Sequence, residues 1–482
     1  MKFEGYRYLD LVTGRYIPIS FSIENSKLKD LRPYVGNEVE GYILPTFTDS
    51  HIHMLDYGFN MRRIDLSDFT ILEEMLDELK RIDDEIIIAR GWDGEKLDRD
   101  PSKDILDHHL GEKPVILIRK CGHMAVVNSK TLKVFSDILR DGLIDEEKGF
   151  ILEDTLTKLM QAVRKFDPVE ILKPAVESLL SFGITSVSSV DLYDEMDQSI
   201  LEALDSIDHF EIFESPAFSS PTNFERVLNE GWLLSNWKNI SIPSVKIFSD
   251  GSFGARTAAL RKPYLDDPTN SGILLHSDDE MEKFMRVCMK IGKQISIHVI
   301  GDRALDQVLK LAKKTGCEGW NLRLIHLQIV EDDQLDELKK LNPEITVQPL
   351  FKISDEDLTC TIFDEDRRRK TYRFSDMMKI GLNLSSSSDA PVEDPNPFLS
   401  MKVLMNEGFS VMDAVRSYTL WATKAVVGEE RRDYLANGEK PSFMVFEDDP
   451  IEVLENGDAE RLKSLRPKAV FFRGKQVYGE KL

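Results

Sequence analysis

The sequence predicts an α/β protein whose main domain is a (β/α)8 TIM barrel, and three observations support this fold class. Eight short apolar runs follow one another along the chain. Amphipathic helical patterns separate several of them, such as DEMEKFMRVCMKIGK and EDDQLDELKKL. This alternation is typical of a parallel sheet covered by helices. Polar residues suited to catalysis stand near the ends of several runs, and the strand ends of a barrel share one face.

The eight apolar runs are the predicted barrel strands, in chain order. They cover residues 42–51, 184–190, 210–218, 244–251, 294–301, 322–330, 345–351 and 382–391. A barrel of this kind needs about 250 residues. The predicted barrel domain, residues 44–429, is longer, and most of the excess falls between the first and second runs. We therefore expect an inserted α/β subdomain at residues 58–165.

Composition limits the partners and the compartment. The chain has 482 residues with a net charge of −23, which disfavours binding to nucleic acid and to anionic membranes. No window approaches 18 uncharged apolar residues, and the start MKFEGYRYLD lacks the apolar core of a signal peptide. The four scattered cysteines fit a reducing compartment. We predict a cytoplasmic protein that acts on a small molecule; a homodimer is only the base-rate expectation.

The stretch LPTFTDSHIH ends the first run with two histidines. His51 and His53 stand two positions apart, so on an extended chain their imidazoles point to the same side. Two neutral imidazoles directed at one point suit a transition metal. Such a pair also occurs by chance, so it indicates a metal site only together with further ligands.

Further polar residues stand on the later runs. Lys246 and Asp250 lie on the fourth run, His298 near the end of the fifth, His326 on the sixth, and Asp389 near the end of the eighth. A barrel brings the ends of all these strands to one face. Four of the nine histidines therefore converge there with an aspartate, and this joint pattern predicts a metal centre.

The chain resembles the metal-dependent amidohydrolase superfamily, and more closely its family 3 branch, which includes N-substituted formamide deformylases. The matching stretches are LPTFTDSHIH, ARGWDGEKLD, GHMAVVNSKTL, VKIFSDGSFGARTAAL, HVIGDRALD, IHLQ, VQP and SSDAPVEDPNPF, followed by YTLWATKAV. Two departures occur. Relatives often carry an acid before the histidine of LIHLQ, and ANGEKPSFMVF replaces a Gly-Lys-Ala-Asp turn. Neither departure changes a proposed ligand, but the first leaves open which groups surround His326.

The resemblance implies one or two divalent metal ions with a defined set of ligands. His51, His53 and Asp389 are expected to bind the more buried ion, and His298 and His326 the second. Zinc is the first expectation for the metal. Iron, manganese and nickel stay open, because mixed histidine and carboxylate sites accept several metals.

Lys246 is the sixth implied ligand, and it needs a chemical change to act as one. A protonated lysine beside a dication is repelled. If CO₂ adds to the neutral amine, the resulting carbamate carries a negative charge and bridges a binuclear metal centre, as in many relatives. The alternative is an ion pair between Lys246 and Asp250 beside a single metal ion.

The implied reaction is hydrolysis of a C–N bond other than a peptide bond, in a small amide, formamide or cyclic amide. A metal-bound hydroxide attacks the polarised carbonyl, and Asp389 carries the proton to the leaving nitrogen. The expected catalytic residues are Asp389, Lys246 and His298. A deaminase, or an esterase or lactonase, on the same scaffold is an alternative. A catalytically silent metal-binding regulatory protein is the non-enzyme alternative, which the complete ligand set disfavours.

Five further residues are predicted to contact the substrate. His123, Trp92 and Asp93 lie in the inserted subdomain; a structural role is the alternative for His123, and a core position is the alternative for Trp92. Arg256 and Thr257 lie in the long connection after the fourth run, where they could hold substrate or shape the pocket. Long connections without regular structure are usually functional.

The two chain ends show strand patterns of their own. They include YRYLDLVTGRYIPISFSI near the start, and FMVF and KAVFFRGKQVY near the end. As in relatives, residues 1–43 and 430–482 are expected to pair into one small β-sandwich domain with a structural role.

Overall fold

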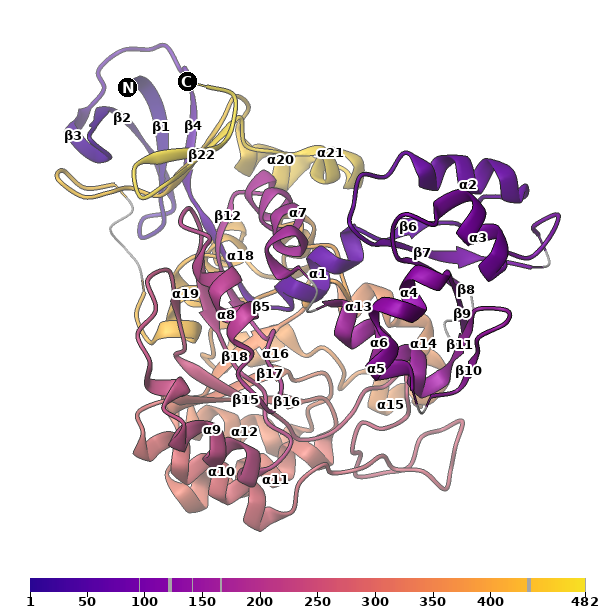
Figure 1. The fold of residues 1–482 in the computed structure, drawn as a ribbon. Helices are drawn as coiled ribbons and strands as arrows, with labels where there is room; N and C mark the ends of the chain where they lie inside the picture. Colours follow the sequence, from indigo (N-terminus) through magenta and orange to yellow (C-terminus); the bar gives the residue numbers. More distant parts are fainter. Residues whose placement is uncertain (95, 120–123, 141, 165–166, 431–434, 482) are drawn as a thin grey trace. The chain divides into compact units, whose positions relative to one another are not determined.

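The chain divides into two compact units, and each is described by itself. The structure is a computed structural model that describes residues 1–482 except 95, 120–123, 141, 165–166, 431–434 and 482. The first unit contains Met1–Met54 and Val176–Leu482, and the second contains Leu55–Ala175. Figure 1 colours the chain from its start to its end.

Eight parallel strands form the centre of the first unit, and each predicted run overlaps one of them. They are β5 (Phe47–Ile52), β12 (Ile184–Ser189), β13 (Glu211–Glu214), β15 (Ser244–Phe248), β16 (Gln294–Val299), β17 (Leu322–His326), β18 (Glu344–Val347) and β19 (Leu384–Ser386). One sheet has the order β14-β13-β12-β5, with β14 at Ile240–Ser241, and the other runs in order from β15 to β19. The prediction of a TIM-barrel-like α/β fold is confirmed.

Backbone hydrogen bonds join these two sheets on both sides. On one side, the Lys246 amide donates to the Pro216 carbonyl at 2.9 Å, and the Phe218 amide donates to the Lys246 carbonyl at 3.1 Å. On the other side, the Asp389 amide donates to the His51 carbonyl at 2.9 Å. The strands therefore follow one another around a closed ring, and their carboxyl ends lie on one face.

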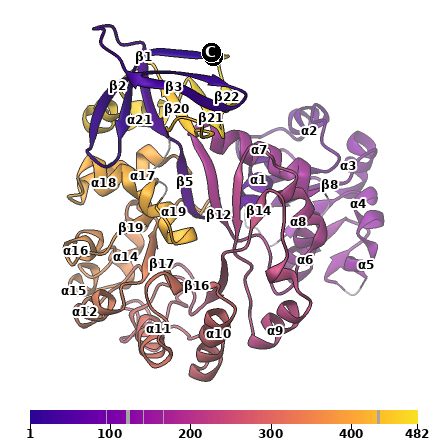
Figure 2. The same cartoon turned by 90° about the vertical axis from the view of Figure 1, so that its left-hand side faces the viewer.

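Helices lie outside this ring of strands (Figure 2). Those of the barrel connections are α8 (Gln198–Asp205), α9 (Pro221–Asn229), α10 (Asp278–Lys290), α11 (Asp302–Thr315), α12 (Asp332–Leu341), α13 (Phe351–Ser354), α14 (Glu356–Ile362), α15 (Glu365–Arg368), α16 (Phe374–Lys379), α17 (Pro397–Asn406), α18 (Val411–Ser417) and α19 (Leu420–Val427). The sequence explains the start of α10, because Ser277 and Glu280 form a reciprocal capping box there. Among the described helices, none is both long and apolar enough to cross a membrane.

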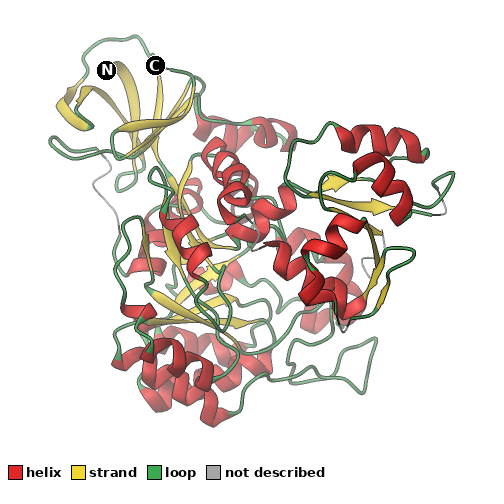
Figure 3. Ribbon diagram, in the orientation of Figure 1, coloured by secondary structure: helices red, strands yellow, loops and turns green. Residues whose placement is uncertain are grey.

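Strands from both chain ends form one sheet, drawn in yellow beside the two termini in Figure 3. They are β1 (Lys2–Asp10), β2 (Arg15–Glu24), β3 (Lys27–Pro33), β4 (Gly41–Pro45), β20 (Phe443–Phe446), β21 (Ala469–Phe472) and β22 (Lys475–Gly479), in the order β22-β21-β20-β4-β1-β2-β3. Helices α20 (Pro450–Asn456) and α21 (Ala459–Ser464) connect β20 to β21. The first predicted run is divided, because its start pairs in this sheet as β4 and its end enters the barrel as β5.

This terminal sheet folds over on itself. Strands β1 and β21 are three positions apart, which places them about 14 Å apart in a flat sheet. The rings of Phe3 and Phe471 are nevertheless only 5.6 Å apart, and Phe443 packs against both at 5.4 and 4.6 Å. One continuous sheet thus encloses its own apolar core, where the sequence predicted two sheets in a sandwich.

The second unit has its own sheet and core. Its strands are β6 (Ile64–Asp65), β7 (Ile87–Trp92), β8 (Val115–Arg119), β9 (Met124–Val127), β10 (Ile144–Asp145) and β11 (Phe150–Leu152), in the order β10-β11-β9-β8-β7-β6. Its helices are α2 (Leu72–Lys80), α3 (Lys103–Leu110), α4 (Ser129–Val134), α5 (Ser136–Leu139) and α6 (Glu153–Arg164), while α1 (Met54–Met61) and α7 (Pro168–Ser181) stand at its two boundaries. The predicted insertion, 58–165, lies within this unit.

The terminal sheet generates a stability prediction. Replacing Phe443 by alanine removes a fully buried ring that contacts three other rings, so the free energy of unfolding should fall by about 3–5 kcal/mol. Urea unfolding followed by circular dichroism measures this change. Val35→Ala is the control, because Val35 is 94% exposed, and it should leave the unfolding curve unchanged. A similar shift for both variants would contradict the assigned core.

Candidate metal centre

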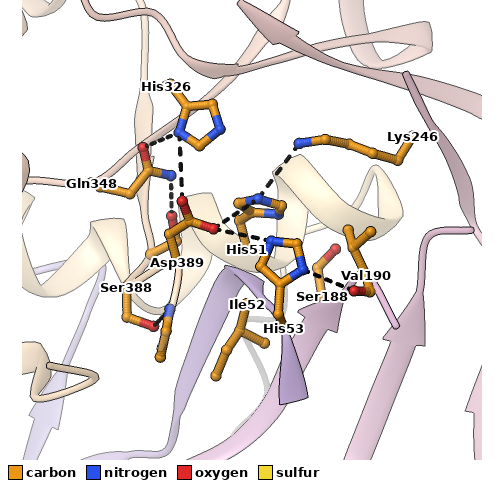
Figure 4. Close-up of polar contacts among 12 residues, drawn as sticks. His51, Ile52, His53, Ser188, Val190, Lys246, His326, Gln348, Ser388 and Asp389 are labelled. Atoms are coloured by element: carbon orange, nitrogen blue, oxygen red, sulfur yellow. Dashed lines mark hydrogen bonds and ion pairs between the residues drawn. The ribbon is translucent and has the colours of Figure 1, made fainter. Parts of the chain in front are cut away.

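The carboxyl ends of the barrel strands bring several polar side chains together (Figure 4). His51, His326 and Asp389 each offer one ligand atom, and these atoms all lie within 4.8 Å of one another. Asp389 Oδ1 lies 3.2 Å from His51 Nε2 and 3.3 Å from His53 Nε2. Both distances agree with two ligands on one tetrahedral ion, which are about 3.4 Å apart when each is about 2.1 Å from the metal.

The surroundings of Asp389 also fit a cation. Its Oδ1 atom is buried and accepts no hydrogen bond of acceptable geometry from the described residues. Burial by itself would raise the pKa of this carboxyl, but the imidazoles of His51 and His53 hold the pKa well below its usual range. A buried carboxylate oxygen without a donor, next to imidazole nitrogens, is the donor set that a divalent transition metal prefers.

Backbone carbonyls determine which nitrogen of two histidines is available to a metal. His53 Nδ1 lies 2.9 Å from the Val190 carbonyl oxygen, and His298 Nε2 lies 3.0 Å from the Gly251 carbonyl oxygen. A carbonyl only accepts, so each of these nitrogens carries the proton. The lone pairs therefore belong to His53 Nε2 and His298 Nδ1. Burial lowers the pKa of His298 to about 4, so it is neutral at pH 7.

Gln348 orients the third histidine. His326 Nδ1 donates to Gln348 Oε1 at 2.8 Å, and the Gln348 amide nitrogen donates to Ser387 Oγ at 2.8 Å. This leaves Nε2 of His326 as the atom with the lone pair. The ring centres of His326 and His298 are 4.5 Å apart, so these two histidines are close enough to bind the same metal ion. The acid that relatives often carry before this histidine is Ile325 here, and Gln348 supplies the orienting contact.

Lys246 projects from β15 toward His51, with Nζ 3.5 Å from Nε2 of that histidine. Its side chain is fully buried, and burial lowers the pKa of its amine to about 7. No ion pair within 4.0 Å joins it to a carboxylate of the described residues. The amine is therefore available in its neutral form at this position.

Asp250 has a different partner from the one that the ion-pair alternative requires. Its carboxylate accepts backbone N–H groups from Ala259, Ile300 and Gly301 at 2.9, 3.1 and 2.7 Å. These bonds hold the connection after β15 against the connection after β16. Asp250 thus organises the loops beside the site, and Lys246 is left without a counter-charge from it.

Asp49 is a positioning residue that the sequence analysis did not assign. Its carboxylate accepts the Ser388 hydroxyl at 2.6 Å, the Ser388 amide at 3.1 Å and the His51 amide at 3.2 Å. It therefore ties the strand that carries His51 to the segment that carries Asp389. The available signal was its place two residues before His51, and for Gln348 the signal was the matched VQP stretch.

Two of the candidate ligands have an unusual backbone. His326 has a φ of 77° and Asp389 has a φ of 56°. Both values lie in the left-handed region of backbone conformation, which residues other than glycine rarely adopt. His326 is the last residue of β17, and Asp389 follows the end of β19. Strain of this kind persists only when surrounding contacts fix it, and it concentrates at functional sites.

The predicted substrate contacts lie in different surroundings. Trp92 fills the core of the second unit and donates from Nε1 to the Leu117 carbonyl at 2.9 Å, while Asp93 is half-buried at the end of the same strand. His123 lies outside the described residues. Their contact with substrate stays a prediction, because the two units are not placed relative to one another.

Arg256 and Thr257 shape the connection after β15. The Arg256 guanidinium pairs with Asp266 at 2.7 Å and donates to the Phe253 carbonyl at 2.8 Å. Thr257 Oγ1 accepts the Ser252 amide at 3.0 Å. Both side chains therefore bind within their own loop, and their contact with substrate stays a prediction.

A cavity of about 310 Å³ lies beside the candidate ligands in the first unit. His51, His53, His298, His326 and Asp389 all line it. A small molecule of this volume would therefore meet the imidazoles and the carboxylate directly, whereas Lys246 lines no part of this cavity.

Comparisons with known proteins identify the family of the chain. A model of the amidohydrolase family, of the family 3 type, matches residues 40–478. The chain is 25% identical to YtcJ of Bacillus subtilis (strain 168), over 90% of this chain and 89% of YtcJ. It is also 25% identical to the protein LONG AFTER FAR-RED 3 of Arabidopsis thaliana, over 93% of this chain and 85% of that protein.

Solved structures give the same result. The structure of an uncharacterized metal-dependent hydrolase from Pyrococcus furiosus matches with a TM-score of 0.78 and 26% identity, over 93% of this chain and 99% of that chain. The structure of an uncharacterized metal-dependent hydrolase from Pyrococcus horikoshii OT3 matches with a TM-score of 0.76 and 28% identity, over 94% of this chain and 98% of that chain. The fold and its site define a hydrolase. The chain belongs to the amidohydrolase family, family 3, as its motifs predicted.

Gln348 provides a test of the site geometry. Gln348→Ala should weaken metal binding by about 10–100-fold, because His326 loses the acceptor that orients its ring. Titration of the chelator-treated protein with Zn²⁺ measures the affinity. Gln348→Glu keeps an acceptor and should restore most of it, and the exposed Gln198→Ala should have no effect. Unchanged affinity in Gln348→Ala would refute the orienting role.

Proposed function

We propose that this chain is a metal-dependent hydrolase that cleaves a C–N bond other than a peptide bond, in a small amide, formamide or cyclic amide. The observation that carries the proposal is the buried Oδ1 atom of Asp389, which accepts no hydrogen bond from the residues that the structure describes and lies within 3.3 Å of two imidazole nitrogens. It faces a cavity large enough for a small substrate. The names of the two Pyrococcus proteins support a metal-dependent reaction.

His51, His53 and Asp389 would hold one divalent ion, with zinc as the proposed metal. His298 and His326 would hold a second ion. Two distances support this division: Asp389 Oδ1 lies within 3.3 Å of a ring nitrogen of both His51 and His53, and the ring centres of His298 and His326 are 4.5 Å apart. The ligand atom of His326 also lies within 4.8 Å of those of His51 and Asp389, so the two ions would be close together. A divalent ion at such a site polarises a carbonyl group and makes a water molecule acidic enough to attack at neutral pH.

Lys246 would act as a carbamate that joins the two ions. Its neutral amine attacks CO₂, a C–N bond forms, and one proton leaves to solvent, so the side chain changes from neutral to negative. Burial and the missing carboxylate partner support this role, because a neutral amine is the form that reacts. The negative carbamate would then offset part of the charge of the dications.

Asp389 would transfer the proton in the reaction. Its carboxylate lies against the imidazoles and lines the cavity, so it can accept a proton from the attacking water. The same group can return that proton to the nitrogen of the leaving amine. Asp49 keeps Asp389 in place for both steps by fixing the neighbouring Ser388. The imidazoles of His53 and His298 are held by backbone carbonyls, and that of His326 is held by Gln348.

Asp389→Asn tests the proton-transfer role. The variant should lose about 10²–10⁴-fold in kcat, because asparagine cannot accept the proton. Hydrolysis of N-benzylformamide and a panel of small amides, followed by amine release, measures it, and metal analysis of the same sample shows whether the ions stay bound. Asp336→Asn, at an exposed position of α12, should match the wild type. Full turnover in Asp389→Asn with metal bound would show that another group transfers the proton.

Lys246→Ala tests the carbamate. The wild type, purified without chelator, should contain about two metal ions per chain, and the variant about one or fewer. Added propionate should restore metal binding to the variant, since a small carboxylate can replace the carbamate in the space left by the lysine. Carbon NMR after growth or dialysis with ¹³C-bicarbonate should show a carbamate signal in the wild type alone. One ion per chain and no carbamate signal would indicate a mononuclear site.

A further inference from the structure

The cavity beside the histidines has an apolar wall and an acidic wall. Apolar side chains that line it include Phe248, Phe253 and Phe351. Two carboxylates, Asp355 and Glu393, line it as well, in addition to Asp389. Among the described residues of the first unit, no lysine or arginine lines this cavity. Two of its three carboxylates therefore take no part in the ligand set proposed above.

Both carboxylates are held by neighbours that carry no positive charge. The hydroxyl of Tyr372, itself buried, donates to Asp355 Oδ2, and Ser354 donates to the Glu393 carboxylate. Burial raises the pKa of both carboxyl groups, since no described ion pair within 4.0 Å compensates either charge. The negative charges of Asp355 and Glu393 also repel each other. A cation bound in the cavity next to both carboxylates would relieve that repulsion.

Two basic residues that are close in sequence to residues lining the cavity form ion pairs with other carboxylates. Lys352 forms an ion pair with Glu407 at 2.6 Å, and Arg256 pairs with Asp266 at 2.7 Å. Neither Lys352 nor Arg256 lines the cavity. The net charge of −23 acts in the same direction, because it raises the local concentration of cationic small molecules and lowers that of anionic ones.

We infer that this cavity selects substrates that carry a protonated amine on an apolar, ring-sized body, with the ammonium group at Asp355 and Glu393. The apolar body would pack against the phenylalanine side chains, and the C–N bond to be cleaved would reach the histidines. The identity of that bond rests on the proposed function, whereas the charge preference rests on the lining residues alone. Substrates with a carboxylate at the same end would be rejected by repulsion.

Binding of three small probes tests the charge preference without any turnover. Isothermal titration calorimetry on the full-length, zinc-loaded protein at pH 7 would compare benzylammonium, benzyltrimethylammonium and benzyl alcohol. The quaternary ammonium cannot coordinate a metal, so it isolates the charge effect. Both cations should bind about tenfold more tightly than the alcohol, a difference typical of one charged contact. Equal affinities for cations and alcohol would overturn the inference.

Variants identify the residues responsible. Asp355→Asn and Glu393→Gln should each reduce the preference about threefold, and the double variant should abolish it. Glu356→Gln and Asp357→Asn are matched controls, because both residues are exposed in the first turn of α14, directly after Asp355, and line no part of the cavity; they should keep the full preference. A preference that survives in the double variant would place the cation elsewhere and overturn the assignment.

A hydrolysis panel separates this inference from the proposed function. N-benzylformamides with a para aminomethyl, hydroxymethyl or carboxylate group differ only at the end remote from the formamide. Cleavage in the order aminomethyl, hydroxymethyl, carboxylate would support both proposals. Cation-selective binding without cleavage of any amide would refute the proposed function alone. Cleavage of all three formamides at similar kcat/KM would refute the substrate preference alone.

Discussion

The closure of the barrel between β5 and β19 is the contact on which the rest of the site depends. The Asp389 amide donates to the His51 carbonyl, and the His53 amide donates to the Ala390 carbonyl at 3.0 Å. The bonds that close the ring of strands thus also place the Asp389 carboxylate against the two imidazoles. Asp49 strengthens this junction from inside the protein through Ser388. Fold and candidate metal centre are therefore fixed by the same few interactions.

Buried charge is the second constraint on the molecule. Lys246 and Arg323 are both fully buried in the barrel, and the Arg323 guanidinium donates to the neutral hydroxyls of Ser296 and Ser188 at 2.9 and 3.0 Å. Burial lowers the pKa of Arg323 to about 9. A buried guanidinium that forms no ion pair with a carboxylate of the described residues is costly in a barrel interior, and its charge also helps to lower the pKa of Lys246. A negative carbamate at Lys246, as proposed above, would offset the charge of Arg323.

The organisation of the chain into two units follows from the geometry of a closed barrel. A closed barrel offers catalytic positions at its strand ends, but its connections are short, so extra structure must be inserted between strands. Here Leu55–Ala175 forms a unit with its own sheet and core, and the chain ends form a folded-over sheet with another core. The first unit contains the candidate ligands, the cavity and the acidic wall.

The sequence alone determined the strands of the barrel and the candidate ligands, because apolar runs and the residues at their ends are local properties. His51, His53, His298, His326 and Asp389 could be found in this way. Their ring nitrogens, and the roles of Asp49 and Gln348, depend on partners far away in the chain; Asp49 and Ser388 are 339 positions apart. The same reason explains why Asp250 was matched with Lys246 as an alternative, and why the joint position of Asp355 and Glu393 in one cavity was not foreseen. Pairing across such distances is decided by how the strands close into a ring, and only the tertiary structure contains that information.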